Sequence, residues 1–139
     1  MHIRPMIPDY YDAIYALWKE TEGLCLRSSD KKKTIVAFLQ KNPTLCFVCV
    51  EGEKLLGTVM AGSDGRRGTI YHLMVASDFR GKGIGKKLMH KVITSLKKLG
   101  IKKAQLFIVK GNKLAEEFYS HLGWIKRDDC VMYSLPMGD

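Results

Sequence analysis

The chain has 139 residues, of which 46% are hydrophobic and 27% are charged, a composition typical of a globular protein rather than a disordered or fibrous one. No apolar run approaches the roughly 18 residues that a membrane span needs, and Met1–Pro5 does not begin a signal peptide, so we expect a cytoplasmic protein without a membrane partner. The net charge of +9 favours an anionic partner, either a nucleic acid or a phosphorylated small molecule.

Hydrophobic periodicity predicts one strand and two helices in the first part of the chain. The strand covers His2–Met6. The first helix begins after Pro8-Asp9 and stops at Gly23, and a residue of Ser28–Asp30 caps the second, which ends at Pro43.

A three-stranded meander follows. Leu45–Val50 and Leu55–Ala61 are strands joined by a tight turn at Glu51–Lys54, and a glycine-rich loop leads to a third strand, Thr69–Val75.

The last part of the chain predicts two more helices and two more strands. A long amphipathic helix carries Ile84, Leu88, Val92, Leu96 and Leu99 on one face and closes at Gly100. The strand Lys103–Val109 is reached through this helix, so it runs parallel to Thr69–Val75. A helix at Lys113–Leu122 and a strand near Cys130–Leu135 complete a single domain, residues 1–139, of the mixed α/β class with helices on both faces of one mostly antiparallel sheet.

The four cysteines, Cys25, Cys46, Cys49 and Cys130, do not form a convincing metal site. Cys46 and Cys49 have C-x-x-C spacing, but they lie in a strand, where residues three apart point to opposite faces. No second pair completes a zinc site. We therefore interpret Cys46 and Cys49 as buried structural thiols.

The most informative motif is Arg80-Gly81-Lys82-Gly83-Ile84-Gly85, between the third meander strand and the long helix. Glycines before a helix N-terminus suit a bound phosphate. The stretch is not a P-loop, because Lys87 follows Gly85-Lys86 where Ser or Thr is required. It is not the dinucleotide fingerprint either, because the third glycine would fall on Lys86. What remains is Arg-x-x-Gly-x-Gly.

A second motif lies further along the chain, with Asn112, Ala115, Phe118-Tyr119 and Gly123-Trp124 in order. Together the two motifs resemble the signatures of the GNAT superfamily of acyl-CoA-dependent N-acetyltransferases, over about residues 1–135. The stretch Gly57–Gly68 resembles a small bacterial branch, the YpeA-like acetyltransferases. The resemblance implies the GNAT fold and an enzyme that moves an acetyl group from acetyl-CoA directly to a primary amine in a ternary complex.

The resemblance also implies where acetyl-CoA binds, without a metal. The backbone of Leu73, Met74 and Val75 would pair with the pantetheine arm. The pyrophosphate would bind the loop and helix start, residues Arg80, Gly81, Lys82, Gly83, Ile84, Gly85 and Lys86. Asn112 would bond the pantetheine arm, although its position suits a helix N-cap equally well.

The sequence offers candidates for the general acid and for the general base. By resemblance, Tyr119 is the general acid for the leaving thiolate; the alternative is a core aromatic. Many family members carry a carboxylate base on the strand before the glycine loop, but Thr69–Val75 has none. His72 is the candidate base, since its reference pKa lies near neutrality. The alternatives are a satisfied core histidine with a water relay, Asp64, or no dedicated base.

The sequence does not identify the amine that accepts the acetyl group. We expect Trp18, Asp64, Arg67 and Tyr71 to bind it, with Tyr71 and His72 projecting to opposite faces of their strand. The alternative for Asp64 and Arg67 is a hairpin loop held by an Asp–Arg pair. A coenzyme A-binding regulatory module without turnover is the alternative function. Nucleic acid is not expected, because no recognised binding motif accompanies the charge, and a homodimer is possible.

Overall fold

The computed structural model describes residues 1–21 and 26–138, so the predicted helix stop at Gly23 and the thiol of Cys25 lie outside the described residues. The chain divides into two compact units, Met1–Phe107 and Ile108–Asp139. The larger unit holds the sheet and three α-helices, and the smaller unit holds one α-helix.

The larger unit is built on one five-stranded sheet with the spatial order β1-β2-β3-β4-β5. Its strands are β1 (His2–Pro5), β2 (Phe47–Glu51), β3 (Lys54–Ser63), β4 (Gly68–Val75) and β5 (Ala104–Leu106). Neighbours from β1 to β4 pair antiparallel, and β5 pairs parallel with β4. This confirms the predicted mixed, mostly antiparallel sheet. The tight turn is also confirmed, because Glu51 pairs with Lys54.

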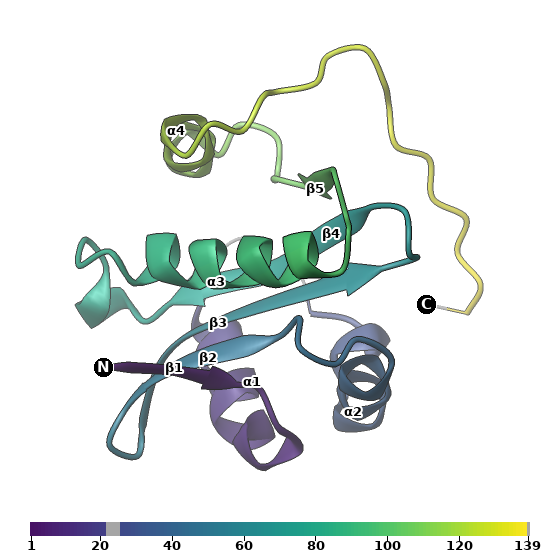
Figure 1. Ribbon diagram of the computed structural model, residues 1–139. Helices are drawn as coiled ribbons and strands as arrows, with labels where there is room; N and C mark the ends of the chain where they lie inside the picture. Colours follow the sequence, from purple (N-terminus) through teal and green to yellow (C-terminus); the bar gives the residue numbers. More distant parts are fainter. Residues whose placement is uncertain (22–25, 139) are drawn as a thin grey trace. The chain divides into compact units, whose positions relative to one another are not determined.

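Helices cover both faces of this sheet (Figure 1). One face carries α1 (Tyr11–Glu20) and α2 (Lys32–Lys41), preceded by the short 3-10 helices η1 (Pro8–Tyr10) and η2 (Ser28–Asp30). Their apolar stripes close over a core that contains Met6, Ile14, Trp18, Ile35, Cys46, Val48, Val50 and Met60.

The opposite face carries α3 (Ile84–Lys98), which follows the 3-10 helix η3 (Ser77–Phe79). Its buried residues are Ile84, Leu88, Met89, Val92 and Leu96. Leu99, predicted on the same stripe, is 55% exposed because the helix has already ended there. Gly100, with a φ of 79°, closes the helix as expected.

A β-bulge interrupts the pairing of β3 with β4. Met60 pairs with Tyr71 and Thr58 with Met74, so His72 and Leu73 together oppose one residue of β3. His72 has a φ of 47°, which is unusual for a residue with a Cβ. Tyr71 packs on Phe38 of α2 and His72 on Trp18 of α1. The prediction that Tyr71 and His72 face opposite sides is therefore wrong, because the bulge breaks the alternation.

The thiols of Cys49 in β2 and of Cys46 directly before it behave as structural residues. Cys46 and Cys49 are both buried. Burial raises the pKa of the Cys46 thiol to about 11 and also raises the pKa of Cys49. Among the described residues, no group of three or more His, Cys, Asp or Glu side chains is placed to hold a metal ion.

Within the smaller unit, α4 (Lys113–His121) confirms the predicted short helix. The predicted strand near Cys130–Leu135 is wrong: residues 125–138 contain no strand, since no neighbouring strand pairs with them and an unpaired strand is not stable. The predicted strand Lys103–Val109 shortens to β5 for the same reason, as only Ala104–Leu106 pairs with β4. None of the helices in the described residues is long and apolar enough to cross a membrane.

Candidate functional site

The glycine-rich loop leads into the N-terminus of α3. Gly81 and Gly83 have φ values of 78° and 82°, and Gly83 is the helix N-cap without a side-chain cap. Among the described residues, no backbone N–H from Gly81 to Lys86 has a backbone acceptor, and the first to find one is that of Lys87, which donates to Gly83 O at 3.1 Å. A run of unpaired N–H groups at the positive end of a helix dipole suits an anionic ligand.

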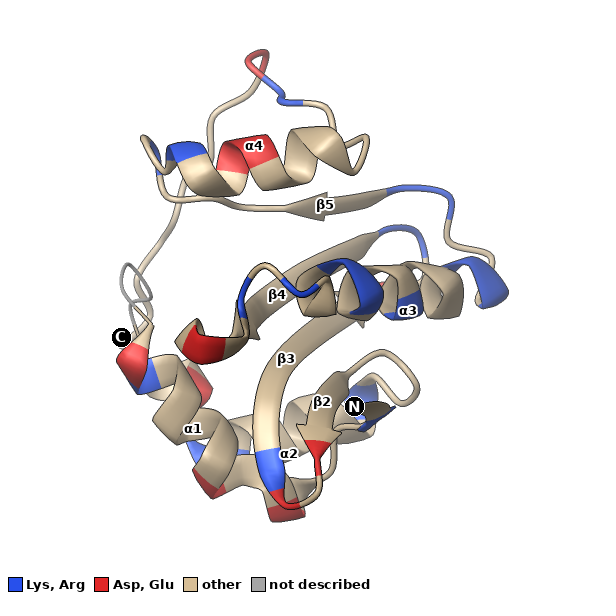
Figure 2. Cartoon of the chain, turned by 90° about the vertical axis from the view of Figure 1, so that its left-hand side faces the viewer, with Lys and Arg blue, Asp and Glu red and all other residues tan. Residues whose placement is uncertain are grey.

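Basic residues are frequent here: Lys and Arg lie in the loop and at both ends of α3 (Figure 2). Lys82 Nζ lies 5.0 Å from the centre of the Phe79 ring. Arg80 Nε donates a 3.1 Å hydrogen bond to the carbonyl oxygen of Val75. This bond ties the loop to the end of β4, so the two stretches predicted to bind acetyl-CoA, Leu73–Val75 and Arg80–Lys86, adjoin each other.

Further back along β4, His72 lies in a hydrogen-bonded cluster. Its Nε2 is 2.7 Å from Asp30 Oδ1, and its ring packs edge-on against Trp18 with centroids 4.5 Å apart. Thr58 Oγ1 accepts from Trp18 Nε1 at 3.1 Å and donates to the carbonyl oxygen of His72 at 2.9 Å. Trp18 is 0% exposed. The prediction that Trp18 binds the acceptor is therefore wrong: it is a core residue that supports His72.

Asp30 is the residue of this cluster that sequence reasoning missed, since it was considered only as a helix cap. It is buried, its Oδ2 accepts from the Arg27 N–H at 3.0 Å, and its own carbonyl oxygen accepts from Tyr11 Oη at 2.7 Å. No local pattern could have indicated the pairing, because 42 positions separate Asp30 from His72.

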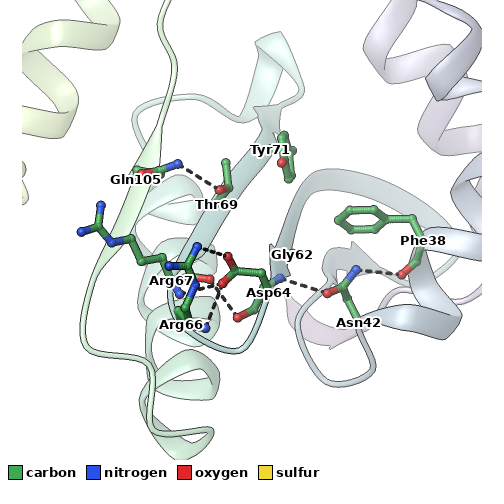
Figure 3. A pocket seen from close by; sticks show the side chains of 10 residues that line it. Phe38, Asn42, Gly62, Asp64, Arg66, Arg67, Thr69, Tyr71 and Gln105 are labelled. Carbon is green, nitrogen blue, oxygen red and sulfur yellow. Dashed lines mark hydrogen bonds and ion pairs between the residues drawn. The ribbon is translucent and has the colours of Figure 1, made fainter. Parts of the chain in front are cut away.

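A cleft of about 680 Å³ opens beside the first half of β4 (Figure 3). Phe38 and Tyr71 form an aromatic wall, with ring centroids 5.8 Å apart and nearly perpendicular planes. Asn42 closes one end by accepting from the Ser63 N–H at 3.0 Å. Gln105 of β5 lines the opposite side. Phe38, Asn42 and Gln105 were not predicted as site residues, because they come from α2, its C-cap and β5, which are distant from Tyr71 in the sequence.

The cleft brings together three of the predicted acceptor residues, Asp64, Arg67 and Tyr71. The Asp64 carboxylate is already engaged in its own loop: Oδ1 accepts from the N–H groups of Arg66 and Arg67 at 2.8 and 3.0 Å, and Oδ2 from the Arg66 guanidinium at 3.1 Å. The backbone N–H groups of Arg67 and Arg66 and the Arg66 guanidinium lower the pKa of Asp64 to about 2. Asp64 thus holds its own hairpin loop through an Asp–Arg pair, which is the alternative to acceptor binding given by the sequence. The ionic partner is Arg66 rather than Arg67.

The smaller unit carries the other predicted residues. Asn112 caps α4, since its Oδ1 accepts from the Ala115 N–H at 3.1 Å, which is the alternative that its position suggested. Tyr119 packs between Phe118 and Trp124, with ring centroids 5.1 and 6.0 Å away. Burial raises the pKa of its phenol to about 12. The phenol therefore stays protonated at neutral pH and can donate a hydrogen bond.

Comparison with known proteins identifies the family of the chain. A profile of the Acetyltransferase (GNAT) family matches residues 11–124. An acetyltransferase of Pectobacterium atrosepticum is 31% identical over 131 residues, which cover 94% of this chain and 92% of that protein.

Two solved structures share the fold. A possible acetyltransferase from Clostridium difficile has a TM-score of 0.76 at 27% identity, covering 98% of this chain and 97% of that one. The PaiA N-acetyltransferase from Thermoplasma acidophilum, solved in complex with coenzyme A, has a TM-score of 0.77 at 18% identity, with 87% of each chain covered. From the family profile and the Pectobacterium relative together, the chain belongs to the GNAT acetyltransferase family.

Proposed function

We propose that this protein transfers an acetyl group from acetyl-CoA directly to a primary amine in a ternary complex. The amine nitrogen attacks the thioester carbonyl carbon, a C–N bond replaces the C–S bond, the amine gives up a proton and the coenzyme A thiolate accepts one. The observation that carries the proposal is the run of unpaired N–H groups from Gly81 to Lys86 at the start of α3, in a chain of the GNAT family.

The donor half of the site follows from that loop. The unpaired N–H groups and Lys82 would hold the pyrophosphate, and the backbone of Leu73–Val75 would pair with the pantetheine arm. The CoA complex of the PaiA structure supports coenzyme A as the ligand. Tyr119 would donate a hydrogen bond to the thiolate; its raised pKa favours that role over full proton transfer.

The acceptor half is assigned to the cleft beside β4. Its polar wall carries Arg67 and Gln105, and its aromatic wall carries Phe38 and Tyr71. Asp64 would hold the loop in shape rather than bind the amine, because both its oxygens already accept hydrogen bonds.

The test is thiol release from acetyl-CoA across a panel of primary amines, with thermal unfolding measured in parallel. We expect acetyl-CoA to raise the unfolding temperature, at least one amine to give saturable turnover, and Tyr119→Phe to lower kcat with little change in acetyl-CoA affinity. Stabilisation without turnover on any amine would support the regulatory coenzyme A-binding module instead. No stabilisation at all would contradict both.

A further inference from the structure

We propose that Asp30 is a positioning residue that makes His72 the general base for the amine; the inference rests on the proposed acetyl transfer. Asp30 Oδ1 and His72 Nε2 are 2.7 Å apart, and both belong to the larger unit. Nothing in the linear sequence connects them.

His72 lies at the position on β4 where the reaction has to occur. The cleft assigned to the acceptor reaches β4 at Tyr71, the residue directly before it. The stretch assigned to pantetheine, Leu73–Val75, begins directly after it. A base between the acceptor and the thioester can take the proton that the attacking amine loses.

The backbone supports this placement. His72 occupies the bulge of β4 with a φ of 47°, a costly conformation for a residue with a Cβ, and such residues gather at functional sites. The bulge turns the ring toward Trp18 of α1, and Tyr71 packs on Phe38 of α2, which covers the same face of the sheet. The bulge therefore brings base and cleft to the same side of the sheet.

Asp30 determines which nitrogen of the imidazole can accept a proton. A buried carboxylate accepts hydrogen bonds only, so Nε2 carries the proton and Nδ1 keeps the lone pair. Among the described residues Nδ1 has no hydrogen-bond partner, and no fully buried side-chain nitrogen or oxygen lacks one. Nδ1 is therefore not fully buried, and the His72 side chain as a whole is 19% exposed.

The groups around this pair are few. Asp30 comes from η2, Trp18 contacts the ring from α1 without a charge, and the Tyr11 hydroxyl, also from α1, reaches the Asp30 carbonyl oxygen. From β3, the uncharged Thr58 hydroxyl donates to the His72 carbonyl oxygen. Among the described residues, Asp30 is thus the charged group in direct contact with the His72 ring.

The sharpest variant is Asp30→Asn, because the Arg27 N–H needs an oxygen opposite it. The asparagine oxygen would face Arg27, as Oδ2 does now at 3.0 Å, and its NH₂ group would face His72 Nε2. The imidazole would then carry its proton on Nδ1 and lose the lone pair there, although its volume and position are kept. The matched control is Tyr11→Phe, which removes a hydrogen bond to the backbone of the same residue but leaves the carboxylate in place.

The experiment measures kcat/KM for the best amine against pH, acetyl-CoA affinity, and the tautomer of His72 by ¹⁵N NMR. We expect Asp30→Asn and His72→Gln each to lose about 100-fold or more in kcat/KM, the double variant to lose no more than either, and acetyl-CoA affinity to stay within about threefold. Tyr11→Phe should keep the wild-type pH profile. Wild-type His72 should carry its proton on Nε2 and Asp30→Asn on Nδ1.

The outcomes separate the two proposals. An active wild type whose Asp30→Asn variant keeps more than a third of kcat/KM, or whose His72 carries its proton on Nδ1, overturns the role of Asp30 and leaves acetyl transfer intact. A wild type that binds acetyl-CoA but acetylates no amine contradicts the proposed function, and the general-base role fails with it. The wild-type NMR spectrum needs no variant to fold, so a destabilised Asp30→Asn protein does not remove the test.

Discussion

The most informative stability prediction concerns Thr58, which is 0% exposed and joins Trp18 to the bulge at His72. Thr58→Val keeps the side-chain shape but removes the hydroxyl that accepts from Trp18 Nε1 and donates to the His72 carbonyl oxygen. Each buried polar group left unpaired costs about 1–3 kcal/mol, and the extra methyl group returns about 0.8 kcal/mol. We therefore expect the free energy of unfolding to fall by about 1–5 kcal/mol.

Urea unfolding, followed by tryptophan fluorescence, measures this change. Thr58→Ser is the control: it keeps the hydroxyl and loses only a methyl group, so it should cost about 1 kcal/mol. The reasoning is refuted if Thr58→Val is as stable as the wild type, or if Thr58→Ser is the less stable of the two. Either result would mean that these hydrogen bonds contribute nothing to the core.

Four further predictions concern two glycines and the thiols. Gly83→Ala should lower the free energy of unfolding by about 1–2 kcal/mol, because the φ of Gly83 is 82°. The same variant should bind acetyl-CoA more weakly in a thermal-shift titration. Unchanged binding would contradict the assignment of this loop to acetyl-CoA. Gly57→Ala would place a Cβ 2.9 Å from the carbonyl oxygen of Met74. We therefore expect the free energy of unfolding, measured in urea, to fall by about 1–3 kcal/mol. An unaltered midpoint of urea unfolding would refute this prediction. In a Cys25→Ser background at pH 8, Cys130 should react with a thiol reagent while Cys46, whose pKa is raised from 9.0 to about 11, reacts only in urea. The folded protein holds the proton of the Cys46 thiol more tightly than the unfolded chain does. The free energy of unfolding should therefore decrease as the pH rises from 9 to 11.

The order of helices and strands in the larger unit could be predicted from sequence because its signals are local. The stripe of α3, the turn at Glu51–Lys54 and the glycines before Ile84 each act within a few residues. Strand ends were less predictable, since a strand extends only as far as its partner: β5 pairs at three positions although apolar residues continue beyond it.

The part of the candidate site that consists of backbone could be proposed from the sequence, whereas the part that consists of long-range contacts could not. The loop Gly81–Lys86 could be recognised because glycine itself signals the backbone geometry. The partner of His72 could not, because Asp30 has an equally good local explanation as a helix cap. Trp18 was predicted to line the acceptor site from the first helix, whereas its burial depends on how α1 packs against Thr58.

The bulge at His72 is where local reasoning and the fold disagree most. Strict alternation would put Tyr71 and His72 on opposite faces of β4, which would separate the acceptor cleft from the proposed base by the thickness of the sheet. One extra residue in β4 removes that conflict, at the cost of a strained histidine held by Thr58 and Asp30. A strained residue held from two sides is the kind of backbone irregularity that gathers at functional sites, and here it would join the two halves of the proposed site.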